Sequence, residues 1–215
     1  MKRKFAIILA SLAFVLLVGC MRSTIRPTVT HIAEPTATLT AGWHRVMGKG
    51  ISISLPDAFV GGDLSESTKK AVTERTKPTN KSLVTMLKAL EQIPNQQILL
   101  FAVDTESSQA GSLLAVTIAY ESVSAVLHPF TYFESYIQRF PPLPFTVRSK
   151  EERSIAGNPA GRMIIEWGEK GARQVIYAVR INTNMYVIGF STPYEKYEEM
   201  LPIFEHSIQS FTVEP

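Results

Sequence analysis

Short apolar segments separated by tight turns constrain the fold of this chain more than any other feature of its sequence. In the first of them, Ile51, Ile53 and Leu55 alternate with serines, which is typical of a strand with one buried face. The short connections favour an antiparallel sheet of six to seven strands. Residues 98–103 and 185–190 are apolar at nearly every position, so we expect both of their faces to be covered. The other strand candidates are residues 113–120, 147–155 (a polar edge strand), 163–167 and 175–181.

Helices are expected to supply that cover. The clearest helix signal is Thr192-Pro193-Tyr194-Glu195, which has the pattern of a capping box with proline at the first helical position. Pro202 lies inside this helix and should bend it. Further helices are predicted over residues 129–140, 80–90 and 67–75. The apolar stripe of the last helix consists of Tyr197, Leu201, Phe204, Ile208 and Phe211.

Three short segments mark the globular part of the chain. They are Trp43 leading into Gly50-Ile-Ser-Ile-Ser-Leu-Pro-Asp57, the turn Ile155-Ala-Gly-Asn-Pro-Ala160, and a closing helix that ends at Ser210-Phe211. In this order they resemble the PsbP-like superfamily, which includes the photosystem II extrinsic subunit and many bacterial lipoproteins. The resemblance covers residues 43–213 and implies an α+β domain, an α/β/α sandwich around a central antiparallel sheet. It supplies no general catalytic motif and implies that the domain acts by binding partners.

The N-terminus has the features of a secretory signal. Lys2, Arg3 and Lys4 precede an apolar run that is too short to span a membrane comfortably, and the run ends in Leu17-Val18-Gly19-Cys20. This ending resembles the lipobox of bacterial lipoproteins, which implies that Cys20 is diacylated and becomes the mature N-terminus. The protein would then lie on the outer side of the cell membrane, or of an outer membrane where one exists. The alternative is an uncleaved membrane anchor, with Cys20 an incidental small residue.

The sequence therefore divides into three parts. Residues 1–19 are the predicted signal peptide, residues 20–42 a tether rich in threonine and proline, and residues 43–215 the globular domain. Lys2, Arg3 and Lys4 account for the whole net charge of +3, so the mature chain is formally neutral and nucleic-acid binding is not expected. Cys20 is the only cysteine, so no disulfide can form within the chain and the core must stabilise the fold.

No motif in the chain predicts catalysis, a cofactor or a metal site. There is no Gly-x-Ser-x-Gly sequence, and the sole cysteine is assigned to lipid. Gly61-Gly62-Asp63 is not followed by Lys-Ser or Lys-Thr and predicts a tight turn. Glu166 should face Arg173 across a hairpin and form a structural ion pair. The histidines, none at metal-ligand spacing from another, are His31, His44, His128 and His206.

Two functional hypotheses remain. The first is a non-catalytic lipoprotein whose domain binds another envelope protein or complex. The second is a carrier or receptor for a small apolar or anionic ligand held between sheet and helices. A candidate basic patch could contact anionic lipid, a wall polymer or an acidic partner, although two solvated helix faces would also explain the charges. The patch consists of Lys69, Lys70, Arg75, Lys77, Lys81 and Lys88.

Overall fold

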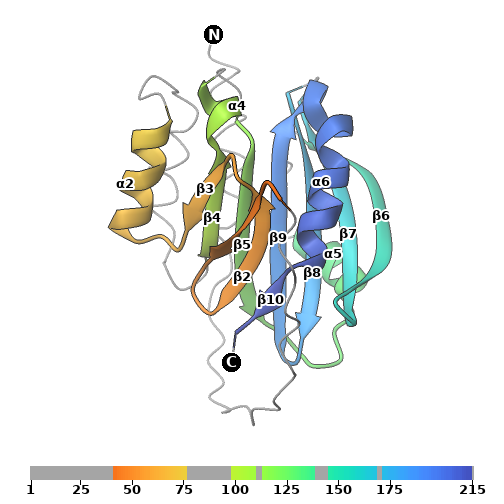
Figure 1. Cartoon of the computed structure of the whole chain (residues 1–215). Coiled ribbons are helices and arrows are strands. Elements are labelled where there is room, and N and C mark those ends of the chain that lie inside the picture. The colour runs from red at the N-terminus through yellow and green to blue at the C-terminus, as the bar shows by residue number, and fades with distance from the viewer. Residues whose placement is uncertain (1–40, 77–97, 110–112, 139–144, 169–170, 215) are drawn as a thin grey trace.

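A large antiparallel sheet forms the centre of the molecule. The structure, a computed structural model, describes residues 41–76, 98–109, 113–138, 145–168 and 171–214. Seven strands pair in the order β3-β4-β5-β9-β8-β7-β6, which confirms the predicted antiparallel sheet and places β6 at an edge (Figure 1). The strands are β3 (Phe59–Gly62), β4 (Ile98–Asp104), β5 (Ala115–Ser122), β6 (Phe145–Ile155), β7 (Asn158–Trp167), β8 (Ala172–Ile181) and β9 (Asn184–Pro193).

A second, smaller sheet lies over one face of the first and was not predicted. It pairs β1 (Trp43–Met47), β2 (Ile51–Pro56) and β10 (Thr212–Val213) in the order β1-β2-β10. The serines of β2 were expected to face solvent, but Ser52 is fully buried. Its hydroxyl accepts a hydrogen bond from Arg45 Nε at 2.7 Å and lies 2.7 Å from the Thr212 hydroxyl. These bonds compensate for the burial of a polar group and link the two ends of the domain.

Helices complete the two outer layers. Helix α6 (Tyr197–Gln209) lies beside the small sheet on the front of the large sheet, and α5 (Pro129–Gln138) lies behind it (Figure 1). Near β3, α2 (Glu66–Arg75) packs its buried Val72 with Phe101 and Val103 of β4. A short helix, α4 (Thr105–Gln109), follows β4. The predicted sandwich is therefore confirmed, and every residue of β4 is buried, as its apolar sequence indicated.

The start of the last helix differs from the prediction. Thr192 remains in β9, paired with Arg173, and its buried hydroxyl does not cap a helix. A short 3-10 helix, η1 (Tyr194–Lys196), leads into α6 instead. The predicted apolar stripe holds at Tyr197, Phe204 and Ile208, whereas Met200 is buried in place of the half-buried Leu201. Pro202 lies inside α6, as expected.

Gly61 and Gly62 belong to β3 and do not form the predicted tight turn. A Cβ at Gly61 would lie 2.1 Å from the Phe101 carbonyl oxygen, so the glycine allows β3 to approach β4 closely. The helix predicted over residues 67–75 is confirmed as α2, whose N-cap is Ser65. The helix predicted over residues 80–90 lies outside the described residues.

Candidate functional site

The turn between β1 and β2 is fixed against the large sheet. The Lys49 backbone N–H donates to the Leu99 carbonyl at 2.8 Å, and the Gly48 N–H donates to the Ile51 carbonyl at 2.8 Å. A Cβ at Gly48 would lie 2.5 Å from the Leu99 carbonyl oxygen, so only glycine allows this approach. Gly50 adopts a φ of 70°, in the region that favours glycine. The sequence Gly48-Lys49-Gly50 thus holds the Lys49 backbone at a defined place on β4.

Two tyrosines of the large sheet lie next to this turn. Tyr120 of β5 and Tyr186 of β9 are cross-strand partners, with ring centroids 6.3 Å apart. Tyr186 also packs on Phe211, at 5.5 Å between ring centroids. Burial raises the pKa of the Tyr186 hydroxyl, partly opposed by a hydrogen bond with Asn184. Tyr186 therefore stays neutral at physiological pH and presents a hydrogen-bonding group on an aromatic surface.

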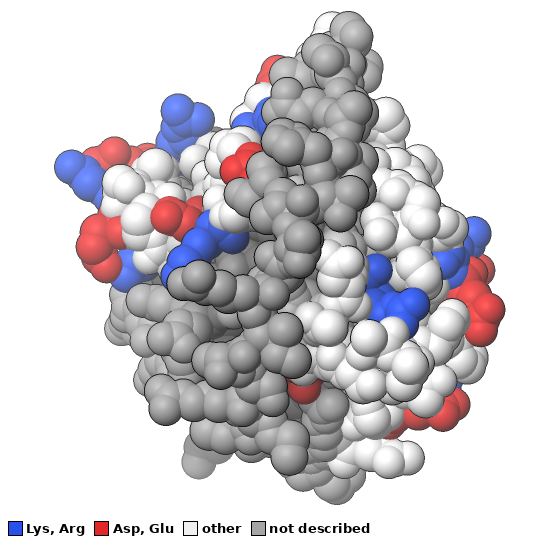
Figure 2. All heavy atoms as spheres, turned by 90° about the horizontal axis from the view of Figure 1, so that it is seen from below, with Lys and Arg blue, Asp and Glu red and all other residues white. Residues whose placement is uncertain are grey.

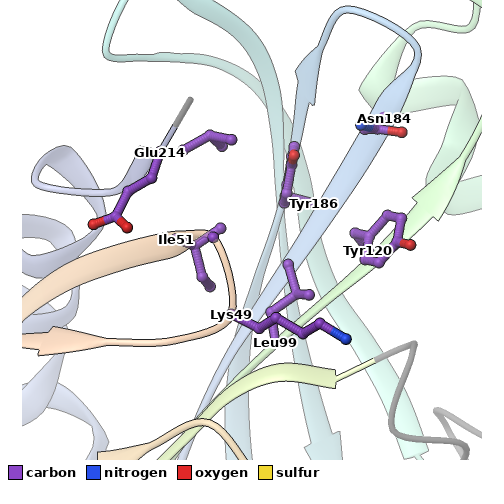
Figure 3. Close-up of a pocket in the computed structure, with 9 residues that line it drawn as sticks. Lys49, Ile51, Leu99, Tyr120, Asn184, Tyr186 and Glu214 are labelled. Atoms are coloured by element: carbon purple, nitrogen blue, oxygen red, sulfur yellow. The ribbon is translucent and has the colours of Figure 1, made fainter. Parts of the chain in front are cut away.

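Between the turn, the tyrosines and the chain end lies a pocket of about 530 Å³. Figure 3 shows the Lys49 ammonium and the Tyr120 hydroxyl extending to the same side, whereas the Glu214 carboxylate points to the opposite side. Within the described part of the chain, neither Lys49 nor Glu214 has an ion-pair partner. The lining residues are Lys49, Gly50, Ile51, Leu99, Tyr120, Asn184, Tyr186, Val213 and Glu214.

This arrangement suits binding of a small molecule. The volume lies within the range of about 300–1,000 Å³ that is usual for ligand pockets. Ile51, Leu99 and Val213 offer apolar contacts, and an ammonium, an amide and two phenols offer polar ones. The lining comes from strands of both sheets and from the turn between β1 and β2, so this pocket lies at the margin between the two sheets and not between sheet and helices, as had been expected for a ligand site.

The predicted basic patch is only partly described. Lys69, Lys70 and Arg75 lie on α2, where Lys69 pairs with Glu66, and Lys70 Nζ lies 3.8 Å from a Glu74 carboxylate oxygen. On the face shown in Figure 2, basic and acidic side chains are interspersed. The structure therefore assigns acidic partners to two of the six predicted residues. Outside the described residues lie Lys77, Lys81 and Lys88, together with the predicted lipidation site Cys20.

Several acidic residues of the sandwich form structural ion pairs. Glu166 faces Arg173 in the sheet, as predicted, with 3.5 Å between Arg173 Nε and Glu166 Oε2. Arg148 donates to the same oxygen at 2.8 Å, and this bond holds the pKa of the Glu166 carboxyl below its usual value. On α6, Glu198 pairs with Arg173 and Glu205 pairs with Arg162. These contacts connect α6 to β7 and β8.

The histidines occupy separate places. His44 Nδ1 lies 3.5 Å from an Asp57 carboxylate oxygen, and His128 Nδ1 lies 3.9 Å from a Glu152 carboxylate oxygen. His206 packs edge-on against Trp43, and His31 lies outside the described residues. In the ranges that the structure describes, no group of three or more His, Cys, Asp or Glu side chains could hold a metal ion. None of the helices in those ranges has the length and apolar character needed to cross a membrane.

Sequence reasoning did not identify the pocket. Its residues come from five separate segments, and the lysine and the two tyrosines have no spacing that links them along the chain. The one local signal is Gly48-Lys49-Gly50, since glycines on both sides of a lysine before a strand predict a tight turn that presents the lysine.

Comparisons with known proteins concern the fold. No family model matches the chain, and no curated protein matches it. Similar solved structures include a PsbP protein of Synechocystis sp. PCC 6803, with 9% identity, 85% of this chain and 98% of that chain covered, and a TM-score of 0.48. LpqN of Mycobacterium tuberculosis, involved in cell envelope biogenesis, is 12% identical; the match covers 80% of this chain and 91% of LpqN, with a TM-score of 0.45.

The immunity protein TplEi of Pseudomonas aeruginosa is 11% identical; the match covers 81% of this chain and 99% of TplEi, with a TM-score of 0.46. A PsbP protein is thus among the solved structures similar to this chain, as the sequence resemblance predicted.

Proposed function

We propose that this protein is a lipid-anchored, extracytoplasmic binding protein without catalytic activity. Cys20 would hold it on the outer side of the bacterial cell membrane, or of an outer membrane where the envelope has one. The observation that carries the proposal is the position of Cys20, directly after Leu17-Val18-Gly19 and a basic and apolar leader. Two acyl chains on one residue suffice for stable anchoring, whereas a single chain binds only marginally.

The tether and the domain fit this placement. Residues 21–42 have a root-mean-square reach of roughly 25 Å if they behave as a flexible coil. Such a reach keeps the domain close to the membrane but clear of the headgroups. The pocket beside Lys49 supports a binding role for the domain.

Fatty-acid labelling tests the anchor. The full chain and its Cys20→Ser variant would be expressed in bacteria supplied with a clickable fatty-acid analogue. We expect label and membrane association for the wild type, and for the variant no label and either release or an unprocessed precursor. Equal labelling of the two proteins would contradict the proposal.

The first candidate partner is another envelope protein or complex, with the basic residues of α2 as one possible contact surface. A photo-crosslinking residue at Lys70 on α2 would be compared in intact cells with one at Arg153 on β6. Both positions are exposed, and they lie near opposite edges of the large sheet. A defined adduct from Lys70 alone is expected. The same adducts from both positions, or none from either, would contradict docking through α2.

The second candidate function is binding of a small ligand, and the pocket beside Lys49 favours it. In this case the protein would act as a carrier or receptor close to the membrane surface. The two functions are compatible, since α2 and the pocket occupy different parts of the fold (Figures 1 and 3).

A further inference from the structure

The pocket beside the Gly48-Lys49-Gly50 turn combines a cationic side with an apolar wall. We propose that it binds a small anionic amphiphile, with the anionic group at Lys49 Nζ and the apolar part against Leu99, Ile51 and Val213. This inference rests on the second candidate function, small-ligand binding, and it names the ligand class. No other part of the proposed function is needed for it.

The anionic group follows from the unpaired ammonium. Lys49 Nζ has no acidic partner within the described part of the chain, unlike Lys69 and Lys70. The Tyr120 hydroxyl extends to the same side, so a phosphate or carboxylate there could accept from both groups (Figure 3). Glu214, the one acidic residue of the lining, directs its carboxylate to the other side of the pocket. The charge that the Lys49 side presents to a ligand is therefore positive.

The apolar part follows from the apolar residues of the lining. Leu99 of β4 and Ile51 of β2 line the pocket, each with only a small part of its side chain exposed. Val213 of β10 and the Tyr186 ring extend this apolar surface. A free inorganic anion would contact none of these groups, whereas an amphiphile buries its apolar chain on them.

The pocket is also preorganised. The Lys49 N–H donates a hydrogen bond to the Leu99 carbonyl, and the Glu214 N–H donates to the Gly50 carbonyl at 2.9 Å. The turn, β4 and the chain end therefore hold their relative positions before a ligand arrives. Little ordering of the backbone is required on binding, which favours affinity.

Titration calorimetry with octyl phosphate, below its micelle concentration, tests the inference. The protein would be residues 20–215 with Cys20→Ser, so that neither lipid nor detergent competes for the ligand. We expect saturable binding, weakened at least about tenfold in Lys49→Gln because a charge-assisted hydrogen bond is lost. Lys49→Arg should retain most of the affinity. Arg153→Gln, which removes an equal charge from the exposed edge strand β6, should bind as the wild type does.

Two related ligands separate the parts of the proposal. Octyl glucoside has the same chain without charge, and inorganic phosphate has the charge without a chain, so both should bind more weakly than octyl phosphate. Equal binding of octyl glucoside would contradict the anionic contact, and equal binding of inorganic phosphate would contradict the apolar contact. Absence of octyl phosphate binding, or equal affinity in wild type and Lys49→Gln, would overturn the inference. None of these outcomes bears on Cys20 lipidation, which the labelling experiment tests separately.

Discussion

The side of the domain under α6 and the side at the Gly48-Lys49-Gly50 turn differ in how their charged side chains are paired. Under α6, Arg162 of β7 pairs with Glu205 of the helix, and Arg173 of β8 pairs with Glu198. At the turn, the Lys49 and Glu214 charges are unpaired within the described residues, although their backbones are firmly held. Paired and packed groups stabilise a fold, whereas unpaired groups on a rigid frame are available to a ligand. The contrast assigns stability to the first region and binding to the second.

The largest expected effect on stability comes from a substitution under α6. Phe204 is buried and stacks on Phe190 of β9, with ring centroids 4.8 Å apart. Phe204→Ala should therefore lower the free energy of unfolding by about 3–5 kcal/mol, because it leaves a cavity between helix and sheet. Glu199→Ala on the exposed side of α6 is the matched control and should change stability by less than about 0.5 kcal/mol. Denaturant unfolding of both variants measures the effect, and a wild-type midpoint for Phe204→Ala would contradict the packing.

Substitution of the turn glycines should lower stability through the backbone of the turn. Gly48→Ala places a Cβ 2.5 Å from the Leu99 carbonyl oxygen and 2.8 Å from Leu100 Cβ, so the turn must move away from β4. We expect a loss of about 1–3 kcal/mol, together with weaker octyl phosphate binding. Gly50→Ala meets no neighbouring atom and should cost only about 1 kcal/mol of conformational strain. Thermal unfolding compares the two, and a larger loss in Gly50→Ala would show that the close approach is not the constraint.

The ion pairs near α6 should appear in the pH dependence of stability. Because Arg148 holds the pKa of Glu166 below its usual value, the carboxylate stabilises the fold above the unfolded-state pKa of about 4.3. This contribution is lost as the pH falls through the lower, folded-state pKa. Glu166→Gln should therefore be less stable than wild type at pH 7, and the difference should shrink toward pH 3. Denaturant midpoints at the two pH values check it, and a difference that grows on acidification would contradict the assignment.

The smallest effect is expected at Lys49. Its ammonium has no ion-pair partner within the described chain, so Lys49→Gln should change the free energy of unfolding by less than about 0.5 kcal/mol. The same variant should lose octyl phosphate affinity. Chemical denaturation, run beside the binding titration, measures both properties on one sample. A substantial loss of stability would mean that Lys49 has a structural role, and the contrast between the two regions would fail.

The sequence predicted the elements whose apolar residues repeat over several positions. Alternation identified β2, and a continuous apolar run identified β4 as covered on both faces. In β9 the run identified a strand, but Val187 and Gly189 on its second face are only half-buried. It did not identify β1, which mixes polar and apolar residues without a period, or β10, which has only two residues. Both strands form by pairing with β2, and for β10 this pairing joins the two ends of the domain. Local sequence patterns do not predict such pairing.

The site was less predictable than the fold. Cys20 and the basic patch were inferred from local patterns, and these remain predictions. The pocket depends on Lys49, Tyr120 and Tyr186 meeting through the pairing of β5 with β9 and the contact of the turn with β4. These contacts join residues far apart in the sequence. The Glu166 pair with Arg173 was predictable because the two residues flank a short hairpin.

The most direct test of the contrast is a map of ligand contacts by two-dimensional NMR. Amide spectra of residues 20–215 with Cys20→Ser would be recorded during an octyl phosphate titration. We expect concentration-dependent shifts at Lys49, Tyr120 and Tyr186 and at their neighbours Asn184 and Val213, with little change along α6. Shifts centred on α6, spread evenly over the domain, or unchanged by Lys49→Gln would contradict it.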